Sequence, residues 1–273
     1  MLLTEMRNPN TTHIDRMTTR DMLKVMNDEN RRVPEAVEQA IPQIVPLVEH
    51  IAQQLSQGGR MFFVGAGTSG RLGVLDAAEC PPTFGVAPDC VVALLAGGKD
   101  AMFQANAGCE DDAAQGAKDL EAYGVTARDT VIGLSAAGGA KYVLGAMELA
   151  KKNGAAIGSV CCNPDVPMLL MADYPIFVNT GAEAITGSTR LKAGSAQKMV
   201  LNLISTSVMI KQGRVYENYM VSMKPTNEKL RTRAIATIAA LTGCADAQAA
   251  EALDRSGDVR SAVEELRGGG EPV

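Results

Sequence analysis

The chain has 273 residues, enough to bury one large core and to add a smaller one. Its formal net charge is −5, it contains no tryptophan, and only 4% of its residues are aromatic, which argues against a general nucleic-acid surface or a base-stacking platform. We find no signal peptide and no apolar run long enough to span a bilayer, so we expect a protein that binds neither nucleic acid nor membrane.

The six cysteines follow none of the spacings of a metal site or of a redox-active pair. Cys161 and Cys162 are adjacent, which suits neither a C-x-x-C motif nor an easy disulfide. We therefore expect reduced thiols in a cytoplasmic protein. His13 and His50 are the two histidines, and neither lies in a segment with other signs of a site, so proton transfer would fall to carboxylates.

The first 17 residues are polar and irregular, and we expect them to form an arm. Thr18 or Thr19 can cap a helix that runs through Met26. Pro34 is a favoured first residue for a second, longer helix that ends before Gly58. We assign residues 1–46 to this amino-terminal arm with its helices.

A strand of apolar residues at 61–64 runs into a glycine-rich turn, Gly-Ala-Gly-Thr-Ser-Gly, at 65–70. Apolar residues at helical spacing follow from Arg71 to Ala78. A strand, a glycine turn and a helix in this order aim free backbone N–H groups at one point, which favours an anion. Pro81 and Pro82 are expected to end this helix behind Glu79, an acid in an otherwise apolar run.

Three interpretations of the glycine turn stay open. The glycine spacing matches the dinucleotide pattern G-x-G-x-x-G, but the next strand, 90–95, ends in Ala-Gly-Gly and lacks the carboxylate that would bind the ribose. The hydroxyl groups of Thr68 and Ser69 favour a loop that holds a sugar phosphate. The third interpretation is a tight turn that binds nothing.

Buried strands alternate with helices through the middle of the chain, which predicts an α/β fold with a doubly wound, mainly parallel sheet of five strands flanked by helices. The expected strands are 61–64, 90–95, 130–134, 156–160 and 175–178. The expected helices that follow the glycine turn are 102–106, 113–123, 142–152 and 188–213. We assign this sheet domain to residues 47–214, and a linker with a small helical bundle to residues 215–273.

Ligands of such sheets bind at the carboxyl ends of the strands. Three features of this chain fall on that edge: the glycine turn at 65–70, a small-residue loop at 135–141, and an acidic turn at Glu110. The sequence therefore predicts one site at this edge.

Four segments, 65–73, 76–82, 186–194 and 226–230, resemble bacterial N-acetylmuramic acid 6-phosphate etherases, and the likeness runs over nearly the whole chain. The segment Asp-Ala-Ala-Glu-Cys-Pro-Pro around Glu79 is specific to that family, whereas many sugar isomerase (SIS) domains share the glycine turn. The resemblance implies an SIS-type sheet, a homodimer whose sites draw on both subunits, and a carboxy-terminal helical module similar to ubiquitin-associated domains.

The reaction that the resemblance implies is cleavage of the D-lactyl ether of N-acetylmuramic acid 6-phosphate, a lyase reaction that gives N-acetylglucosamine 6-phosphate and D-lactate. It needs no metal and no redox cofactor, because the aldehyde of the open-chain sugar acidifies the C2 proton and general acid–base help supplies the rest. Glu79 and Glu110 match the family's two catalytic glutamates. We assign Glu79 as the acid to the departing lactate and Glu110 as the base at C2 or the activator of water.

The candidate substrate- and phosphate-binding residues lie in three segments of the chain. They are Gly67, Thr68, Ser69 and Gly70 in the glycine turn; Ser135, Gly138, Gly139 and Lys141 in the second loop; and Glu183, Ser188 and Lys192 in and beside the third segment of resemblance.

The second loop departs from the family's usual Ala-Ser-Gly-Arg-Thr-Pro-Tyr and reads Ala-Ala-Gly-Gly-Ala-Lys-Tyr at 136–142. Two hydroxyl groups are absent, and each hydrogen bond to a charged group is worth about 1.5–3 kcal/mol. Backbone N–H groups, the helix dipole and Lys141 can offset part of this loss. Two functions stay open: the glutamate pair favours the lyase, and the altered loop favours a non-catalytic SIS-domain sensor or regulator that binds a sugar phosphate.

Overall fold

The computed structural model describes residues 1–104, 107–223, 225 and 227–268. Its contacts separate two compact units: Met1–Ala77 with Asp89–Ser205, and Ala78–Pro88 with Thr206–Val273. The arm and the first helices thus group with the sheet. The expected division into 1–46, 47–214 and 215–273 stays a prediction. No helix among the described residues is both long and apolar enough to cross a membrane.

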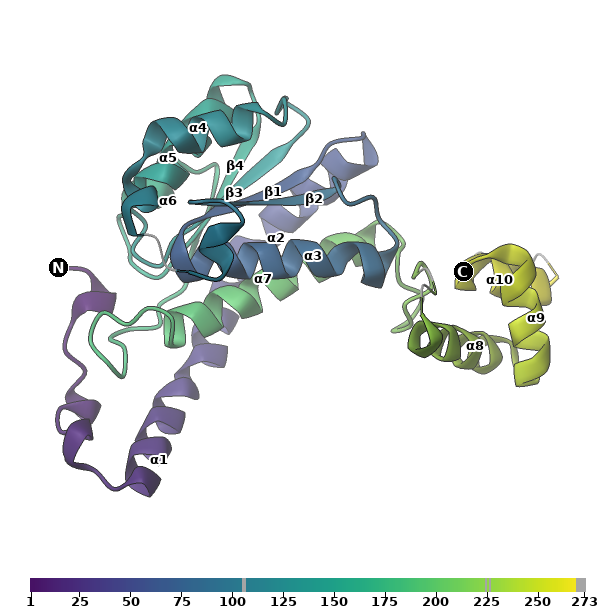
Figure 1. Cartoon of the computed structure of the whole chain (residues 1–273), viewed down its shortest axis with the longest axis horizontal. Coiled ribbons are helices and arrows are strands. Elements are labelled where there is room, and N and C mark those ends of the chain that lie inside the picture. The colour runs from purple at the N-terminus through teal and green to yellow at the C-terminus, as the bar shows by residue number, and fades with distance from the viewer. Residues whose placement is uncertain (105–106, 224, 226, 269–273) are drawn as a thin grey trace. The chain divides into compact units, whose positions relative to one another are not determined.

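A parallel five-stranded sheet forms the centre of the first unit, in the order β2-β1-β3-β4-β5 (Figure 1). The register places Met61 of β1 opposite Val91 of β2 and Thr130 of β3. The strands are β1 Met61–Gly65, β2 Val91–Leu95, β3 Thr130–Leu134, β4 Ala156–Cys161 and β5 Tyr174–Phe177. The doubly wound, mainly parallel sheet that the sequence predicted is confirmed.

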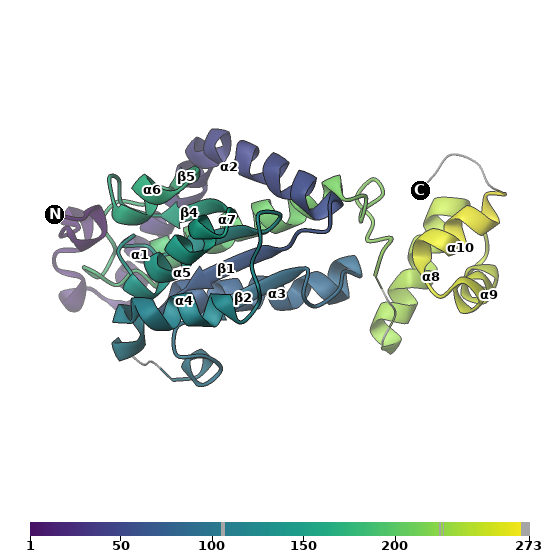
Figure 2. The ribbon, with the colours of Figure 1, turned by 90° about the horizontal axis from the view of Figure 1, so that it is seen from above.

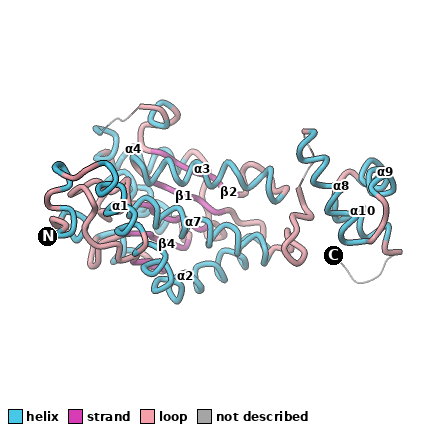
Figure 3. The backbone as a smooth tube through the Cα atoms, turned by 90° about the horizontal axis from the view of Figure 1, so that it is seen from below, coloured by secondary structure: helices cyan, strands magenta, loops and turns pink. Residues whose placement is uncertain are grey.

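Helices cover both faces of this sheet, so its central strands are buried from end to end (Figure 3). The face covered by α4 and α5 contains Phe62, Val131 and Met147 in one core cluster. On the other face, Gly158 of β4 packs against Leu47 of α2. The helices that belong wholly or partly to this unit are α1 Thr19–Asn30, α2 Arg32–Ser56, α3 Gly67–Phe84, α4 Ala113–Glu121, α5 Lys141–Lys152, α6 Pro167–Met171 and α7 Lys192–Lys211.

Short 3-10 helices fill the irregular segments of the first unit. Three of them lie in the expected arm, residues 1–17. The expected helix at 102–106 is wrong in its described part, because a 3-10 turn ends at Met102. Asn106 lies outside the described residues. These short helices are η1 Leu3–Glu5, η2 Pro9–Thr11, η3 Ile14–Arg16, η4 Asp100–Met102 and η5 Ala107–Asp111. The sequence analysis also missed α6, which has only five residues and therefore shows no periodicity.

Prolines do not end helices where we expected them to. α3 continues through Pro81 and Pro82 to Phe84, so Glu79 lies inside the helix and not at its end. An internal proline removes an N–H bond and crowds the preceding turn. Cys80 and Phe84 are both buried, at 2% and 7% exposure, and we ascribe the survival of the last turn to this burial. α2 likewise continues through Pro42 and Pro46, which are both exposed, while Ile44 and Leu47 on the same helix are buried.

The second unit contains three helices that pack against one another, α8 Glu228–Thr242, α9 Asp246–Ser256 and α10 Val259–Leu266 (Figure 2). Asn227 and Asp258 cap α8 and α10 by accepting hydrogen bonds from the backbone N–H groups of Leu230 and Ser261. Ile238, Leu253 and Val263 lie in the shared core. The expected helical bundle is confirmed, its likeness to a ubiquitin-associated domain stays a prediction, and Thr226 of the resemblance lies outside the described residues.

Candidate functional site at the carboxyl edge of the sheet

The two small-residue loops leave the same edge of the sheet, because β1 and β3 are parallel neighbours. β1 ends at Gly65 and leads into α3, and β3 ends at Leu134 and leads into α5. The segment that contains Glu110 follows β2, which pairs with β1 in parallel. The three strands that precede these features therefore end at one edge of the sheet, as expected.

The glycine turn allows α3 to begin almost against the end of β1. A Cβ atom on Gly70 would lie 2.5 Å from the carbonyl oxygen of Gly65 and 2.5 Å from Cδ1 of Leu95, so only glycine fits there. The N–H of Gly70 donates to the carbonyl of Ala66. No described residue accepts a hydrogen bond from the backbone N–H groups of Gly67, Thr68 and Ser69. These N–H groups at the first turn of α3 are therefore available to a ligand.

Ser69 is buried, and its hydroxyl donates to Oε1 of Gln197 at 2.8 Å. Gln197 lies on α7 and is 1% exposed. Its Nε2 is a buried donor that has no partner among the described residues. The sequence analysis missed Gln197, because a pair separated by 128 positions leaves no local pattern.

The second loop, residues 135–141, is held by hydrogen bonds to its backbone carbonyls and by one of its own side chains. Ser135 is buried, and its Oγ accepts from the N–H of Gly138 at 3.0 Å. Gly138 has a φ of 74°, and a Cβ there would lie 2.2 Å from Val166. Gly139 is exposed and faces open space, and α5 begins at Lys141 without a side-chain cap.

Lys141 is exposed and forms an ion pair with Asp111, at 3.3 Å between Nζ and Oδ1. The pair links the second loop to the acidic turn that contains Glu110. Because both side chains face water, at 63% and 72% exposure, the pair contributes about 0–1 kcal/mol and an anion can replace the carboxylate.

The two candidate catalytic glutamates are both exposed. Glu110 lies in η5, in the first unit, and Glu79 lies in the part of α3 that groups with the second unit. One turn before Glu79, Asp76 is buried and accepts from Nζ of Lys198 on α7 at 2.7 Å.

Glu183 and Lys192 belong to a buried cluster that includes Glu29, a residue that the sequence analysis did not select. The carboxylate of Glu183 accepts from the backbone N–H groups of Lys192 and Ala193, both at 2.9 Å, and so caps α7. The ammonium group of Lys192 donates to Glu29 at 2.5 Å. Ser188 lies in the preceding loop, half-buried. Substrate contact by these three candidates stays a prediction.

Burial and hydrogen bonding act in opposite directions on the pKa values of the two carboxyl groups in this cluster. Burial acts to raise the pKa of Glu29, but the hydrogen bonds from Asn10, Lys192 and Asn8 outweigh it and lower the pKa to about 2. Burial raises the pKa of Glu183, and the N–H groups of Ala193 and Lys192 offset only part of this effect.

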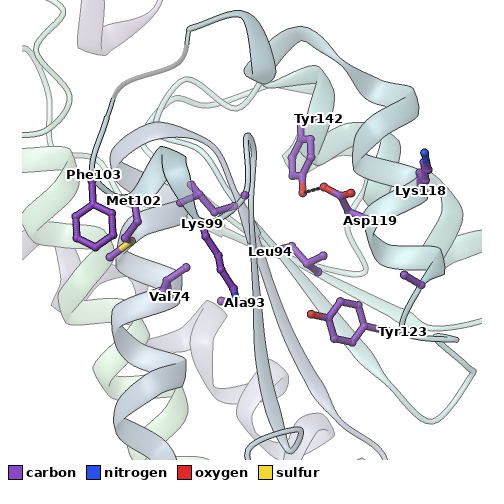
Figure 4. A pocket seen from close by; sticks show the side chains of 13 residues that line it. Val74, Ala93, Leu94, Lys99, Met102, Phe103, Lys118, Asp119, Tyr123 and Tyr142 are labelled. Atoms are coloured by element: carbon purple, nitrogen blue, oxygen red, sulfur yellow. Dashed lines mark hydrogen bonds between the residues drawn. The ribbon is translucent and has the colours of Figure 1, made fainter.

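Two neighbouring cavities lie beside the sheet edge. The smaller, of about 470 Å³, is lined by the Gly97–Gly98 turn, by Cys109 and by Asp112. The larger, of about 740 Å³, lies over β2 and has mostly apolar walls (Figure 4). The hydroxyl of Tyr142 donates to Asp119 at 2.7 Å, an interaction that Figure 4 marks with a dashed line. Burial raises the pKa of this phenol, and the neighbouring carboxylate of Asp119 raises it further. No cluster of metal-binding side chains occurs in the described part of the chain.

Comparisons with known proteins agree with this architecture. A family described as "Glucokinase regulatory protein N-terminal SIS domain" matches residues 43–151, and "SIS domain" matches residues 113–207. A solved phosphoheptose isomerase from Francisella tularensis superimposes with a TM-score of 0.57 at 15% identity, covering 71% of this chain and 100% of its own, which shows a shared fold.

Two sequence relatives match over almost the full chain. The N-acetylmuramic acid 6-phosphate etherase of Halalkalibacterium halodurans is 50% identical over 97% of this chain and 98% of its own length. The enzyme of the same name from Cutibacterium acnes is 50% identical over 93% of this chain and 84% of its own length.

Proposed function

This chain belongs to the N-acetylmuramic acid 6-phosphate etherase family, and we propose that it is the corresponding lyase. It cleaves the D-lactyl ether of N-acetylmuramic acid 6-phosphate to give N-acetylglucosamine 6-phosphate and D-lactate. The observation that carries the proposal is the 50% identity to an etherase over 97% of the chain.

Two carboxyl groups supply the proton transfers in this proposal. The base, which we assign as Glu110, removes the C2 proton of the open-chain sugar, and the electron pair forms the C2–C3 double bond. The C3–O bond breaks, and Glu79 protonates the oxygen of the departing lactate. Water then adds at C3 and a proton returns to C2, so the ether is hydrolysed overall. Each proton transfer contributes about 10²–10⁴-fold.

Phosphate binding is supported by the open starts of α3 and α5. The N–H groups of Gly67, Thr68 and Ser69 have no acceptor among the described residues, and the same holds for Gly139 and Ala140 at the start of α5. The positive ends of two helices that leave one sheet edge favour a dianion. Lys141, whose exposed pair with Asp111 is weak, supplies a cation.

We further propose that the protein works as a cytoplasmic homodimer in which each site draws residues from both subunits. The support for this proposal is the resemblance of four sequence segments to the etherases, which implies such a dimer. Mixing subunits from two glutamate variants tests which subunit supplies each glutamate.

A regulator that binds a sugar phosphate without turnover is the second candidate. The observation that favours it is the second loop, whose single hydroxyl, on Ser135, is buried and already accepts from Gly138.

The decisive experiment is incubation of the purified protein with N-acetylmuramic acid 6-phosphate and measurement of D-lactate. We expect release by the wild type, a loss of about 100-fold or more in kcat for Glu79→Gln and for Glu110→Gln, and wild-type turnover for Glu148→Gln, an exposed glutamate of α5. Tight binding of N-acetylglucosamine 6-phosphate with no lactate would support the regulator instead.

A further inference from the structure

We propose that Asn163 is a positioning residue that ties the second loop to the amino-terminal arm, residues 1–17, and so sets the backbone N–H groups that receive the sugar phosphate. This inference rests on the proposed function, because it concerns how the same site holds its substrate. Asn163 follows β4 at the carboxyl edge of the sheet and is fully buried.

The amide of Asn163 uses its acceptor and both donors. Its Oδ1 accepts from the backbone N–H of Thr4 at 3.2 Å. Its Nδ2 donates to the carbonyl of Ala136 at 2.8 Å and to the hydroxyl of Thr4 at 3.0 Å. A carbonyl on one side and a backbone N–H on the other allow only this orientation of the amide. A side chain of this size with both donors and an acceptor is therefore required.

Thr4 is the residue of the arm that bonds to Asn163, and it is fully buried as well. Its carbonyl accepts from the N–H of Gly187, in the loop that leads to α7. Further along the arm, Asn8 donates to the carbonyl of Ala182 and to Glu29. The arm is thus bonded both to Asn163, which holds the second loop, and to the loop that ends at Lys192.

The contact to Ala136 matters because the second loop would bind phosphate mainly through its backbone N–H groups. The carbonyl of Ala136 accepts from the N–H of Cys162 as well as from Asn163, which fixes the first half of the loop against β4. Gly139 and Ala140, in the second half, keep their N–H groups without an acceptor in the described structure. Because two hydroxyls of the family pattern are absent, the second loop's contribution to phosphate affinity depends on the position of these N–H groups, and small displacements are costly.

Asn163→Asp separates the two ties. Aspartate still accepts from the N–H of Thr4, but it presents a negative oxygen to the carbonyl of Ala136 where the amide donated. We expect KM for N-acetylmuramic acid 6-phosphate and Kd for N-acetylglucosamine 6-phosphate to rise about tenfold or more, roughly one charge-assisted hydrogen bond, with kcat within about threefold of wild type. The Kd of unphosphorylated N-acetylglucosamine should not change.

Three further variants make the result specific. Thr4→Val removes the hydroxyl that Asn163 contacts and should raise Kd for the phosphorylated sugar by a few fold, whereas Thr4→Ser should restore wild-type binding. Asn153→Ala removes an asparagine that donates to a carbonyl, that of Val125, at the other end of α5. This control should cost stability without changing KM or Kd.

The outcomes separate the inference from the proposed function. If folded Asn163→Asp keeps wild-type Kd, or loses both sugars equally, the inference is overturned. If Asn163→Asp does not fold, Thr4→Val and Thr4→Ser decide it by the same Kd comparison. If the wild type binds the phosphorylated sugar without releasing lactate, the etherase proposal fails while the Kd comparison still judges Asn163. A wild type that binds no sugar phosphate overturns both.

Discussion

Glu29, on α1, is a carboxylate with 3% exposure, and it stays charged because two other segments of the chain supply its hydrogen-bond donors. Asn8 and Asn10 of the arm donate to it, and so does Lys192 at the start of α7. A buried charge without such partners would be costly. The cluster therefore ties α1, the arm and α7 together at one residue.

The low pKa of Glu29 predicts an acid-sensitive fold. Its pKa falls from 4.5 to about 2 on folding, so its contribution is fully present above pH 4.5 and is lost as the pH falls from 4.5 towards 2. A shift of this size corresponds to about 3 kcal/mol of unfolding free energy. Glu29→Gln should therefore lower stability at pH 7 and flatten the dependence below pH 5, as measured by urea unfolding at several pH values.

The matched control for this prediction is Glu35→Gln, which changes an exposed glutamate in the first turn of α2. It should keep the wild-type slope between pH 5 and pH 2. A Glu29→Gln variant with the same acid slope as the wild type would contradict the assignment.

At the scale of elements, the closeness of β1 and α3 depends on glycines that leave no room for a side chain. Gly65 and Gly70 approach each other across the turn, and a Cβ on Gly65 would lie 2.6 Å from the backbone of Gly70. This approach sets where the open N–H groups of α3 point. The turn is thus both a packing contact and part of the proposed phosphate site.

Gly70→Ala should disturb both properties. The added methyl must displace the end of β1 or Leu95, and we expect a loss of about 1–3 kcal/mol in unfolding free energy together with a raised KM. Denaturant unfolding and lactate kinetics measure the two effects. Gly194→Ala on α7 is the control, because its Cβ would lie 3.4 Å from the nearest atom, and we expect stability at or above wild type.

At the scale of the whole molecule, the proposed dimer raises the question of which subunit supplies each glutamate. Glu110 lies in the first compact unit, and Glu79 lies in residues 78–88, which group with the second. If each site combines these glutamates from two chains, one damaged copy can complement another.

Mixing Glu79→Gln with Glu110→Gln tests this arrangement. After subunit exchange, half of the dimers are mixed, and each mixed dimer has one site with both glutamates intact, so roughly a quarter of wild-type lactate release should return. Each variant alone should stay inactive. If the protein sediments as a dimer and exchanges subunits without regaining activity, both glutamates of a site come from one chain.

The sequence by itself determined the five strands, the longer helices and the order of these elements. Continuous apolar runs such as 130–134 predicted buried parallel strands. Thr18 or Thr19 was the expected cap of α1, and the side chain of Thr18 is the one that caps it. The glycine turn, the small-residue loop and the acidic turn all follow strands that end at one edge, as expected, because neighbouring parallel strands have their carboxyl ends on the same side of a sheet. These signals are local, so a window of about ten residues contains them.

Only the tertiary structure decided which polar side chains meet. Glu29 and Lys192 are 163 positions apart, Ser69 and Gln197 are 128 apart, and Thr4 and Asn163 are 159 apart. It also decided that α3 runs past its prolines, where burial of Cys80 and Phe84 competes with a local breaking signal. A hydrogen bond between distant residues has no periodicity along the chain, because it forms only after packing has brought the two groups together and removed them from water.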